Sequence, residues 1–147
     1  MEKSIKIKIK LLNENAKIPV RASEHASGFD IFSAQKTILK AKSFQLISTG
    51  FAIEMPQSME AQIRPRSGLA IKHGITILNS PGTIDADYRG EIKVILINHS
   101  DTDFKIEIGT RIAQIVFSKI VETEFEQVEN LNESIRGENG FGSTGLH

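Results

Sequence analysis

Residues 37–63 read TILKAKSFQLISTGFAIEMPQSMEAQI, and this stretch decides the fold class. It holds four short apolar runs, at 37–39, 44–47, 51–55 and 59–63, separated by Gly, Pro, Ser or Lys. Short runs at such close spacing are typical of β-strands joined by tight connections. The stretch therefore predicts an all-β domain, either a β-sandwich, a jelly roll or a barrel.

The sequence on both sides of this stretch continues the pattern. Isoleucines alternate with lysines from Ile5 to Leu11, a period of two that gives one buried and one solvated strand face. Residues 92–97 hold four successive apolar residues after Lys93, which is typical of a strand covered on both faces. In so small a domain, another subunit is a candidate for one of those covers. Further strands are predicted at 29–32, 75–78, 104–108 and 109–117.

Composition limits the possible functions. The 147 residues are the length of one domain, and the chain has no cysteine, which excludes disulfides, thiolate zinc sites and a thiol nucleophile. Eighteen basic and 18 acidic side chains give a net charge of zero, which argues against binding long nucleic acid by bulk charge. No signal peptide and no run of 18 apolar residues is present, so we expect a cytoplasmic protein without membrane contact.

The stretch 64–98 carries most of the polar chemistry. Arg64 and Arg66 flank Pro65, and residues 67–74 form the one helix candidate, with Ser67 as its cap and Gly74 as its end. Free amides at the start of such a helix, beside Arg66, would bind an anion. A purely structural cap explains the serine equally well.

A second polar group lies at the other end of what we interpret as one hairpin. Asp85, Asp87, Tyr88 and Arg89 follow the loop 79–82 and precede the most apolar strand. An anion site and a carboxylate-plus-aromatic turn suggest a phosphorylated ligand with a flat ring. A basic loop and a salt-bridged turn without function remain the alternative.

Two further polar residues stay open between structural and functional roles. Asp30 follows Gly28 at a bend, where a carboxylate serves either as a turn cap or in a site. Gln114 interrupts an apolar strand, so it either satisfies the core or contacts a ligand. The four histidines show no metal-ligand spacing. The polar, glycine-rich tail is too poor in apolar residues to fold alone, yet its amides and Phe141 suit a nucleotide.

Five ordered segments carry a resemblance to one family: residues 26–34, 65–70, 82–91, 111–117 and 136–145, the last ending in GFGSTG. Together they closely resemble the trimeric deoxyuridine triphosphatases, or dUTPases. The resemblance implies a jelly-roll-like fold with one short helix and a flexible C-terminal arm, in a single domain of residues 1–147 whose residues 122–147 form the arm and a glycine-rich lid. It also implies a homotrimer with sites at subunit interfaces. The implied reaction is magnesium-assisted hydrolysis of dUTP to dUMP and pyrophosphate, which keeps uracil out of DNA and supplies dUMP for thymidylate synthesis.

The resemblance also implies a role for each matching residue. Asp85 would be the general base that orients the attacking water and meets the sugar 3′-hydroxyl, with Arg89 helping to keep it ionised. Tyr88 would pack on the deoxyribose and exclude a 2′-hydroxyl. The uracil would be read by Asn79, Thr83, Ile84 and Lys93. The phosphates would be held by Arg66, Ser67, Gly68 and Gln114. The lid, from another subunit, would use Arg136, Phe141, Gly142, Ser143 and Thr144.

The implied cofactor is Mg²⁺, held mainly by phosphate oxygens and water, with Asp30 as an indirect contact through water. One departure from the family pattern is Asn139, which stands where the tail motif usually has glycine. Asparagine tolerates positive φ better than most residues, so we expect the lid still to bend, with closure somewhat slower or weaker.

Two alternatives compete with this interpretation. A deoxycytidine triphosphate deaminase shares the fold, but such enzymes lack a GFGSTG tail, which this chain has. A non-catalytic nucleotide sensor or protein-binding regulator would show a lost base or a truncated tail, and this sequence has neither.

Overall fold

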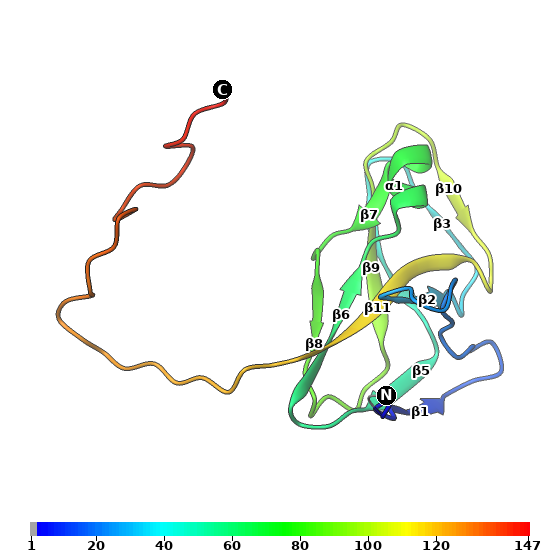
Figure 1. Ribbon diagram of the computed structural model, residues 1–147. Helices are drawn as coiled ribbons and strands as arrows, with labels where there is room; N and C mark the ends of the chain where they lie inside the picture. The colour runs from blue at the N-terminus through cyan, green and yellow to red at the C-terminus, as the bar shows by residue number, and fades with distance from the viewer. Residues whose placement is uncertain (1–2) are drawn as a thin grey trace.

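The computed structural model describes residues 3–147, and these contain eleven β-strands and one short α-helix (Figure 1). In chain order the elements are β1 (Lys8–Leu11), β2 (Phe29–Phe32), β3 (Thr37–Leu39), β4 (Phe44–Ser48), β5 (Phe51–Glu54), β6 (Met59–Arg64), α1 (Ser67–His73), β7 (Ile75–Ile77), β8 (Gly82–Ile84), β9 (Lys93–Asn98), β10 (Phe104–Ile106) and β11 (Arg111–Lys119). The all-β prediction with one short helix is confirmed.

The strands pair antiparallel in an order that differs from their order in the chain. One sheet runs β2-β11-β6-β8 and a second runs β4-β9-β7, while β1 pairs with β5 and β3 with β10. Partners such as β2 and β11 are far apart in sequence, which is the jelly-roll-like arrangement that the sequence predicted.

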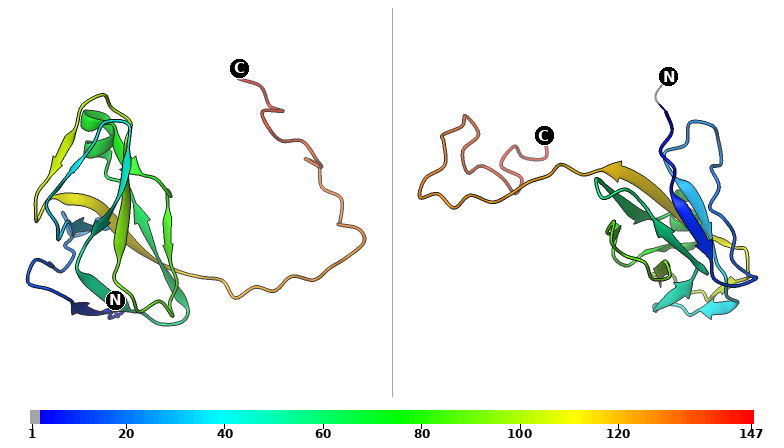
Figure 2. Two further views of the ribbon diagram at one scale, coloured as in Figure 1. Left: turned by 180° about the vertical axis from the view of Figure 1, so that it is seen from behind. Right: turned by 90° about the horizontal axis from the view of Figure 1, so that it is seen from below.

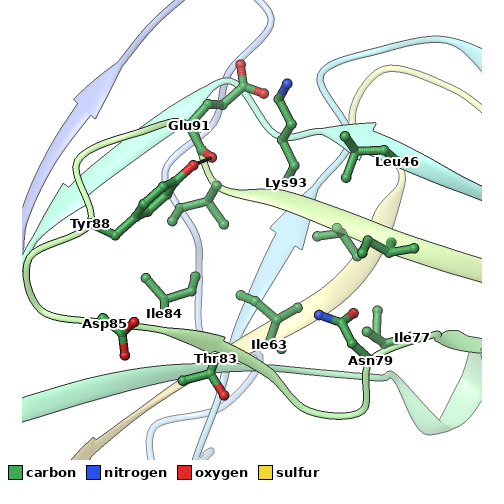
Figure 3. A pocket seen from close by; sticks show the side chains of 14 residues that line it. Leu46, Ile63, Ile77, Asn79, Thr83, Ile84, Asp85, Tyr88, Glu91 and Lys93 are labelled. Carbon is green, nitrogen blue, oxygen red and sulfur yellow. Dashed lines mark hydrogen bonds between the residues drawn. The ribbon is translucent and has the colours of Figure 1, made fainter.

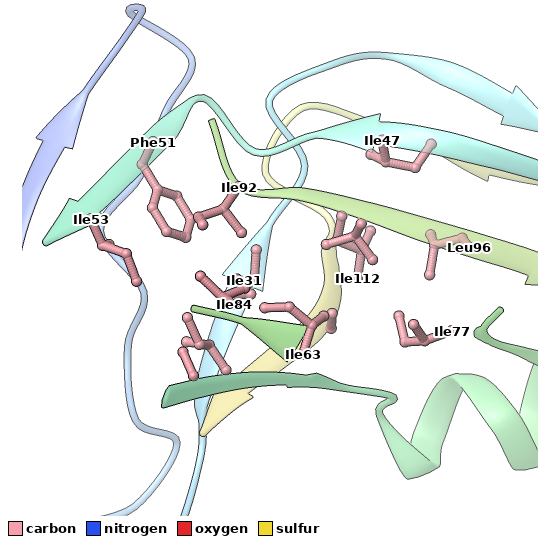
Figure 4. Close-up of a cluster of buried hydrophobic side chains, with 14 of the residues drawn as sticks. Ile31, Ile47, Phe51, Ile53, Ile63, Ile77, Ile84, Ile92, Leu96 and Ile112 are labelled. Atoms are coloured by element: carbon pink, nitrogen blue, oxygen red, sulfur yellow. The ribbon is translucent and has the colours of Figure 1, made fainter. Parts of the chain in front are cut away.

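One apolar core joins the two larger sheets, and Figure 4 shows side chains from both meeting in it. Alternation along β6 directs Met59, Ala61 and Ile63 inward. On β9, alternate residues from Val94 onward are buried, whereas Ile95 and Ile97 on the opposite face are only half-buried. The chain itself therefore covers one face of β9 fully, and the prediction of two covered faces holds only in part.

Two local predictions need correction. β1 begins at Lys8 and not at Ile5, because only residues 8–11 lie opposite β5; Ile5 is 48% exposed. Ser67 does not cap α1: the cap position is Arg66, in extended conformation, and no side chain bonds the free amides. Gly74 ends the helix with φ of 65°, as predicted.

The expected hairpin is present only in part: β7 and β9 pair antiparallel, but the connection between them contains an additional strand, β8. β7 pairs with β9 and β8 pairs with β6, so residues 78–81 and 85–92 each cross from one sheet to the other. Sequence reasoning missed β8, which is three residues long and begins with glycine. Gly82 allows the close approach, since a Cβ there would lie 3.3 Å from Ile63 Cβ on β6.

Beyond β11 the chain leaves the body as a long extended segment, visible in Figures 1 and 2. Residues 120–147 contain no helix or strand, and their large apolar side chains are mostly exposed to solvent. Within residues 3–147, no helix is long and apolar enough to cross a membrane.

Candidate active site

A cavity of about 360 Å³ opens between the 82–85 segment and β9 (Figure 3). Tyr88 and Asp85 lie at one end of it and Asn79 at the other. The cavity is lined by Leu46, Ile63, Ile77, Asn79, Gly82, Thr83, Ile84, Asp85, Tyr88, Glu91, Ile92, Lys93, Val94 and Ile95. Its apolar floor and few polar rim groups are typical of a small-molecule site.

The turn after β8 orients the tyrosine. The Tyr88 backbone N–H donates to the Asp85 carbonyl at 3.1 Å, which closes a turn. The Tyr88 hydroxyl donates to the Glu91 carbonyl at 2.9 Å. Gly90 makes this possible, because a Cβ there would lie 2.4 Å from the Tyr88 oxygen. The ring is therefore held against the backbone of residues 90–91.

Asp85 is exposed at the cavity rim, where a ligand or water can reach its carboxylate. Arg89 does not support it as the sequence suggested. The Arg89 guanidinium donates to the Ala86 and Tyr88 carbonyls and pairs with Glu54 at 3.6 Å. The spacing of four residues brings side chains together on a helix, whereas this segment is a turn.

The other end of the cavity is shaped by the connection 78–81, which contains a cis Ser80–Pro81 bond. The Ser80 hydroxyl donates to the Ile77 carbonyl. A Cβ on Gly82 would lie 3.3 Å from the Asn79 side-chain nitrogen, so glycine leaves room for that amide. Asn79 and the β8 backbone thus present hydrogen-bonding groups at one edge of an otherwise apolar cavity.

A second polar cluster lies outside the cavity walls, where β2 and β11 meet the start of α1. The Asp30 side chain, only 12% exposed, pairs with Arg66 Nε at 3.3 Å and with Arg111 Nη1 at 2.7 Å. Arg66 Nη1 also donates to the Arg111 carbonyl at 3.2 Å. Arg64 turns away to Gln62, so the two arginines around Pro65 have different partners.

Gln114 belongs to this second cluster. Its side-chain nitrogen donates to the Pro65 carbonyl at 3.0 Å, which fixes the residue that precedes Arg66. Gly28 leaves room for the amide, since a Cβ there would lie 2.4 Å from the Gln114 oxygen. In this structure Gln114 therefore positions the 65–66 backbone.

The structure thus divides the predicted site residues into three groups. The cavity contains Asn79, Thr83, Ile84, Asp85, Tyr88 and Lys93. The second cluster contains Asp30, Arg66 and Gln114, with Ser67 and Gly68 exposed in the first turn of α1. The exposed tail carries Arg136, Phe141, Gly142, Ser143 and Thr144.

Sequence reasoning missed two charged residues of these groups. Glu91 lines the cavity, and Ser48 donates to its carboxylate at 2.6 Å. Arg111 completes the cluster around Asp30. The strand pairing of β2 with β11 is the signal that would have linked Arg111 to Asp30, because it brings residues 30 and 111 together.

Magnesium would have few protein ligands here. Among residues 3–147, no group of three or more His, Cys, Asp or Glu side chains is placed to hold a metal ion. Mg²⁺ retains most of its water and is commonly bound by one or two carboxylates plus substrate phosphates. A single buried carboxylate beside Arg66 is compatible with that mode of binding.

Comparison with known proteins identifies the family. The sequence model of the dUTPase family matches residues 14–145. A deoxyuridine 5′-triphosphate nucleotidohydrolase from Clostridium tetani is 55% identical over 139 residues, 95% of this chain and 96% of that protein. One from Rickettsia akari is 58% identical over 144 residues, 97% of each.

Solved structures agree with this relationship. The dUTPase of Staphylococcus bacteriophage 80alpha, solved with dUPNHPP, superposes with a TM-score of 0.89 at 31% identity, covering 96% of this chain and 99% of that one. A mutant dUTPase from phage phi11 of S. aureus, which coordinates a structural Mg(II) ion, gives 0.81 at 26% identity, with coverages of 87% and 99%. The protein is thus an enzyme of nucleotide metabolism. The chain belongs to the dUTPase family.

Proposed function

We propose that this enzyme hydrolyses dUTP to dUMP and pyrophosphate in the cytoplasm, as a homotrimer whose sites lie at subunit interfaces. One observation supports a site shared between subunits: the parts of the proposed site lie apart on a single chain. The cavity, the second polar cluster around Asp30 and the tail occupy three different places on one chain. Neighbouring copies would bring one of each together around a nucleotide.

The exposed apolar residues support assembly. Phe125, Leu131 and Ile135 on the tail are 107%, 87% and 108% exposed. Phe44 and Leu46 on β4, beside the half-buried face of β9, are 63% and 51% exposed. Burying one such side chain stabilises by about 1.5–3 kcal/mol, which would offset part of the cost of association between copies.

In the proposed complex the base lies in the cavity. The Asn79 amide, the backbone at Thr83 and Ile84, and Lys93 read the uracil edge, and a cytosine would leave buried partners unpaired. Tyr88 packs on the deoxyribose and excludes a 2′-hydroxyl. The ring is already fixed by its bond to Glu91, so it needs no rearrangement to act as a wall.

Asp85 acts as general base in this proposal. Its carboxylate accepts a proton from water while the water oxygen bonds to the α-phosphorus. The bond from that phosphorus to the oxygen bridging to the β-phosphate breaks, and pyrophosphate leaves. Arg66, with the amides of Ser67 and Gly68, binds the phosphate oxygens, and Gln114 holds the loop that carries them.

Bound Mg²⁺ would neutralise charge on the triphosphate, with Asp30 in contact through water. The lid would place Arg136 on the phosphates and Phe141 on the uracil. In the extended tail the positive-φ positions are Gly137, Phe141, Gly142 and Gly145, and Asn139 is not among them. Asn139 instead forms a turn with Arg136, whose Nε donates to the Asn139 carbonyl at 2.8 Å.

Product analysis with dUTP, UTP, dTTP and dCTP in magnesium tests the reaction. We expect pyrophosphate from dUTP in large excess over the others, and ammonia release from dCTP would instead indicate a deaminase. Asp85→Asn should retain binding of a non-hydrolysable dUTP analogue and reduce turnover on the order of 10²–10⁴-fold. Asp87→Asn, at an exposed carboxylate two residues away, is the matched control. Equal turnover in the Asp85 variant and the control would remove Asp85 from this role.

A further inference from the structure

We propose that Arg111 is a positioning residue for phosphate binding, acting through Asp30 on Arg66. Asp30 would then serve chiefly to orient an arginine, in addition to any contact with magnesium-bound water. The inference rests on the proposed function, because it assumes that Arg66 binds substrate phosphate.

The contacts form a chain of three charged groups. Each Asp30 oxygen has its own arginine: Arg111 Nη1 donates to Oδ2 at 2.7 Å, and Arg66 Nε lies 3.3 Å from Oδ1. The carboxylate is 12% exposed and the Arg66 and Arg111 side chains are 32% and 43% exposed, so solvent screens these pairs less than it screens a fully exposed ion pair. Arg111 therefore fixes the carboxylate that Arg66 meets.

Arg66 is held at two of its nitrogens. Nε faces Asp30 and Nη1 donates to the Arg111 carbonyl at 3.2 Å. A guanidinium is planar and has five N–H donors, so two fixed contacts set its plane and leave Nη2 and part of Nη1 for a ligand. Both anchors depend on residue 111, one through its side chain and one through its backbone.

The Asp30 backbone and the Arg111 guanidinium are themselves held by neighbouring residues. Its backbone exchanges hydrogen bonds with Val20, at 2.7 and 3.2 Å, and lies opposite Gln114 on β11. The guanidinium of Arg111 lies over the Phe32 ring at 5.4 Å, which fixes it from its other side. A rigid support of this kind is what precise placement of a binding group requires.

The test compares binding of dUMP and of a non-hydrolysable dUTP analogue to the full-length protein. If Arg111 acts through Arg66, Arg111→Gln should weaken analogue binding about 10- to 100-fold, by analogy with the loss of an outer hydrogen-bond partner of a metal-ligating residue. Binding of dUMP should change little. Arg21→Gln is the matched control, because the Arg21 guanidinium lies over Phe29 of β2 at 4.8 Å and, among residues 3–147, its hydrogen bond goes to the Glu24 carbonyl rather than to Asp30 or Arg66.

A double-mutant comparison identifies the route. In an Arg66→Gln background, Arg111→Gln should cause no further loss, because its effect passes through Arg66. Independent, multiplying losses would overturn the proposal, as would an equal loss of dUMP binding. A wild type that neither binds the analogue nor releases pyrophosphate from dUTP would instead refute the proposed function itself.

Asp30→Asn provides a second variant if Arg111→Gln does not fold. The asparagine keeps the shape of Asp30 and removes the charge that holds Arg66. We expect the same selective loss of analogue binding, and we expect it to persist when EDTA removes magnesium. A loss that disappears without magnesium would assign Asp30 to the metal and overturn its role as an anchor for Arg66.

Discussion

Replacing Gly90 by alanine should relax the sugar specificity of the enzyme without touching the ligand directly. A Cβ at position 90 would lie 2.4 Å from the Tyr88 oxygen, 2.7 Å from Cζ and 3.0 Å from Cε2. Carbon atoms in contact lie about 3.5–4.0 Å apart, so the ring has to move by roughly 1 Å. That movement breaks the hydroxyl's bond to the Glu91 carbonyl.

Two effects contribute to the expected magnitude. Loss of the hydrogen bond alone is worth about 0.5–1.5 kcal/mol, which corresponds to roughly 2- to 12-fold in a rate ratio. A displacement near 1 Å in a group that shapes the site can reduce activity about 100-fold. Tyr88→Phe, which removes only the bond, should therefore lower the preference for dUTP over UTP by roughly 2- to 12-fold, and Gly90→Ala by more, up to about 100-fold.

The assay has an internal reporter. Tyr88 is the only tyrosine and the chain has no tryptophan, so tyrosine emission arises from this ring alone. The kcat/KM ratio for dUTP and UTP gives the specificity, and thermal denaturation verifies that both variants fold. If Gly90→Ala leaves both the emission and the dUTP/UTP ratio unchanged, the 90–91 backbone does not hold the ring and the reasoning fails.

Two further predictions concern the tail and the core. Deleting residues 136–147 should abolish most turnover but leave the oligomer intact, as measured by light scattering. Monomers after the deletion would contradict the assignment of these residues to a lid. Asn98→Ala should lower the free energy of unfolding by about 3 kcal/mol or more, because the buried amide forms hydrogen bonds with Leu39, Ser100 and Thr102. Denaturant titration measures this change, and a loss below about 1 kcal/mol would show that these hydrogen bonds contribute little to stability.

Sequence patterns predicted strands that form short apolar runs bounded by Gly, Pro, Ser or Lys. The run at 37–39 coincides with β3, and 59–63 falls within β6, where residues of one face are buried. β8 escaped detection because three residues beginning with glycine have no readable period. The family resemblance rather than periodicity carried the functional prediction, since it identified the hairpin-like segment as one half of a nucleotide site.

Contacts between distant residues were beyond the reach of spacing rules. Asp30 and Arg111 are 81 positions apart and meet only because β2 pairs with β11. Asp85 and Arg89 have a spacing that would join them on a helix, yet the turn directs Arg89 to Glu54. In both cases the partner of a charged group is set by the strand and turn geometry, which a single sequence does not contain.

The net charge of the second polar cluster, which we propose binds phosphate, gives the strongest reason to infer that Asp30 orients Arg66. A nucleoside triphosphate is highly anionic, and this chain has no net charge with which to attract it. Arg66 and Arg111 alone would supply two positive charges, and Asp30 reduces the local sum to one. A carboxylate that halves the attraction for the ligand weakens binding unless it contributes something else. We propose that it contributes a fixed orientation for Arg66, since without Asp30 the contact at Arg66 Nε would be lost and the two guanidinium groups would repel each other.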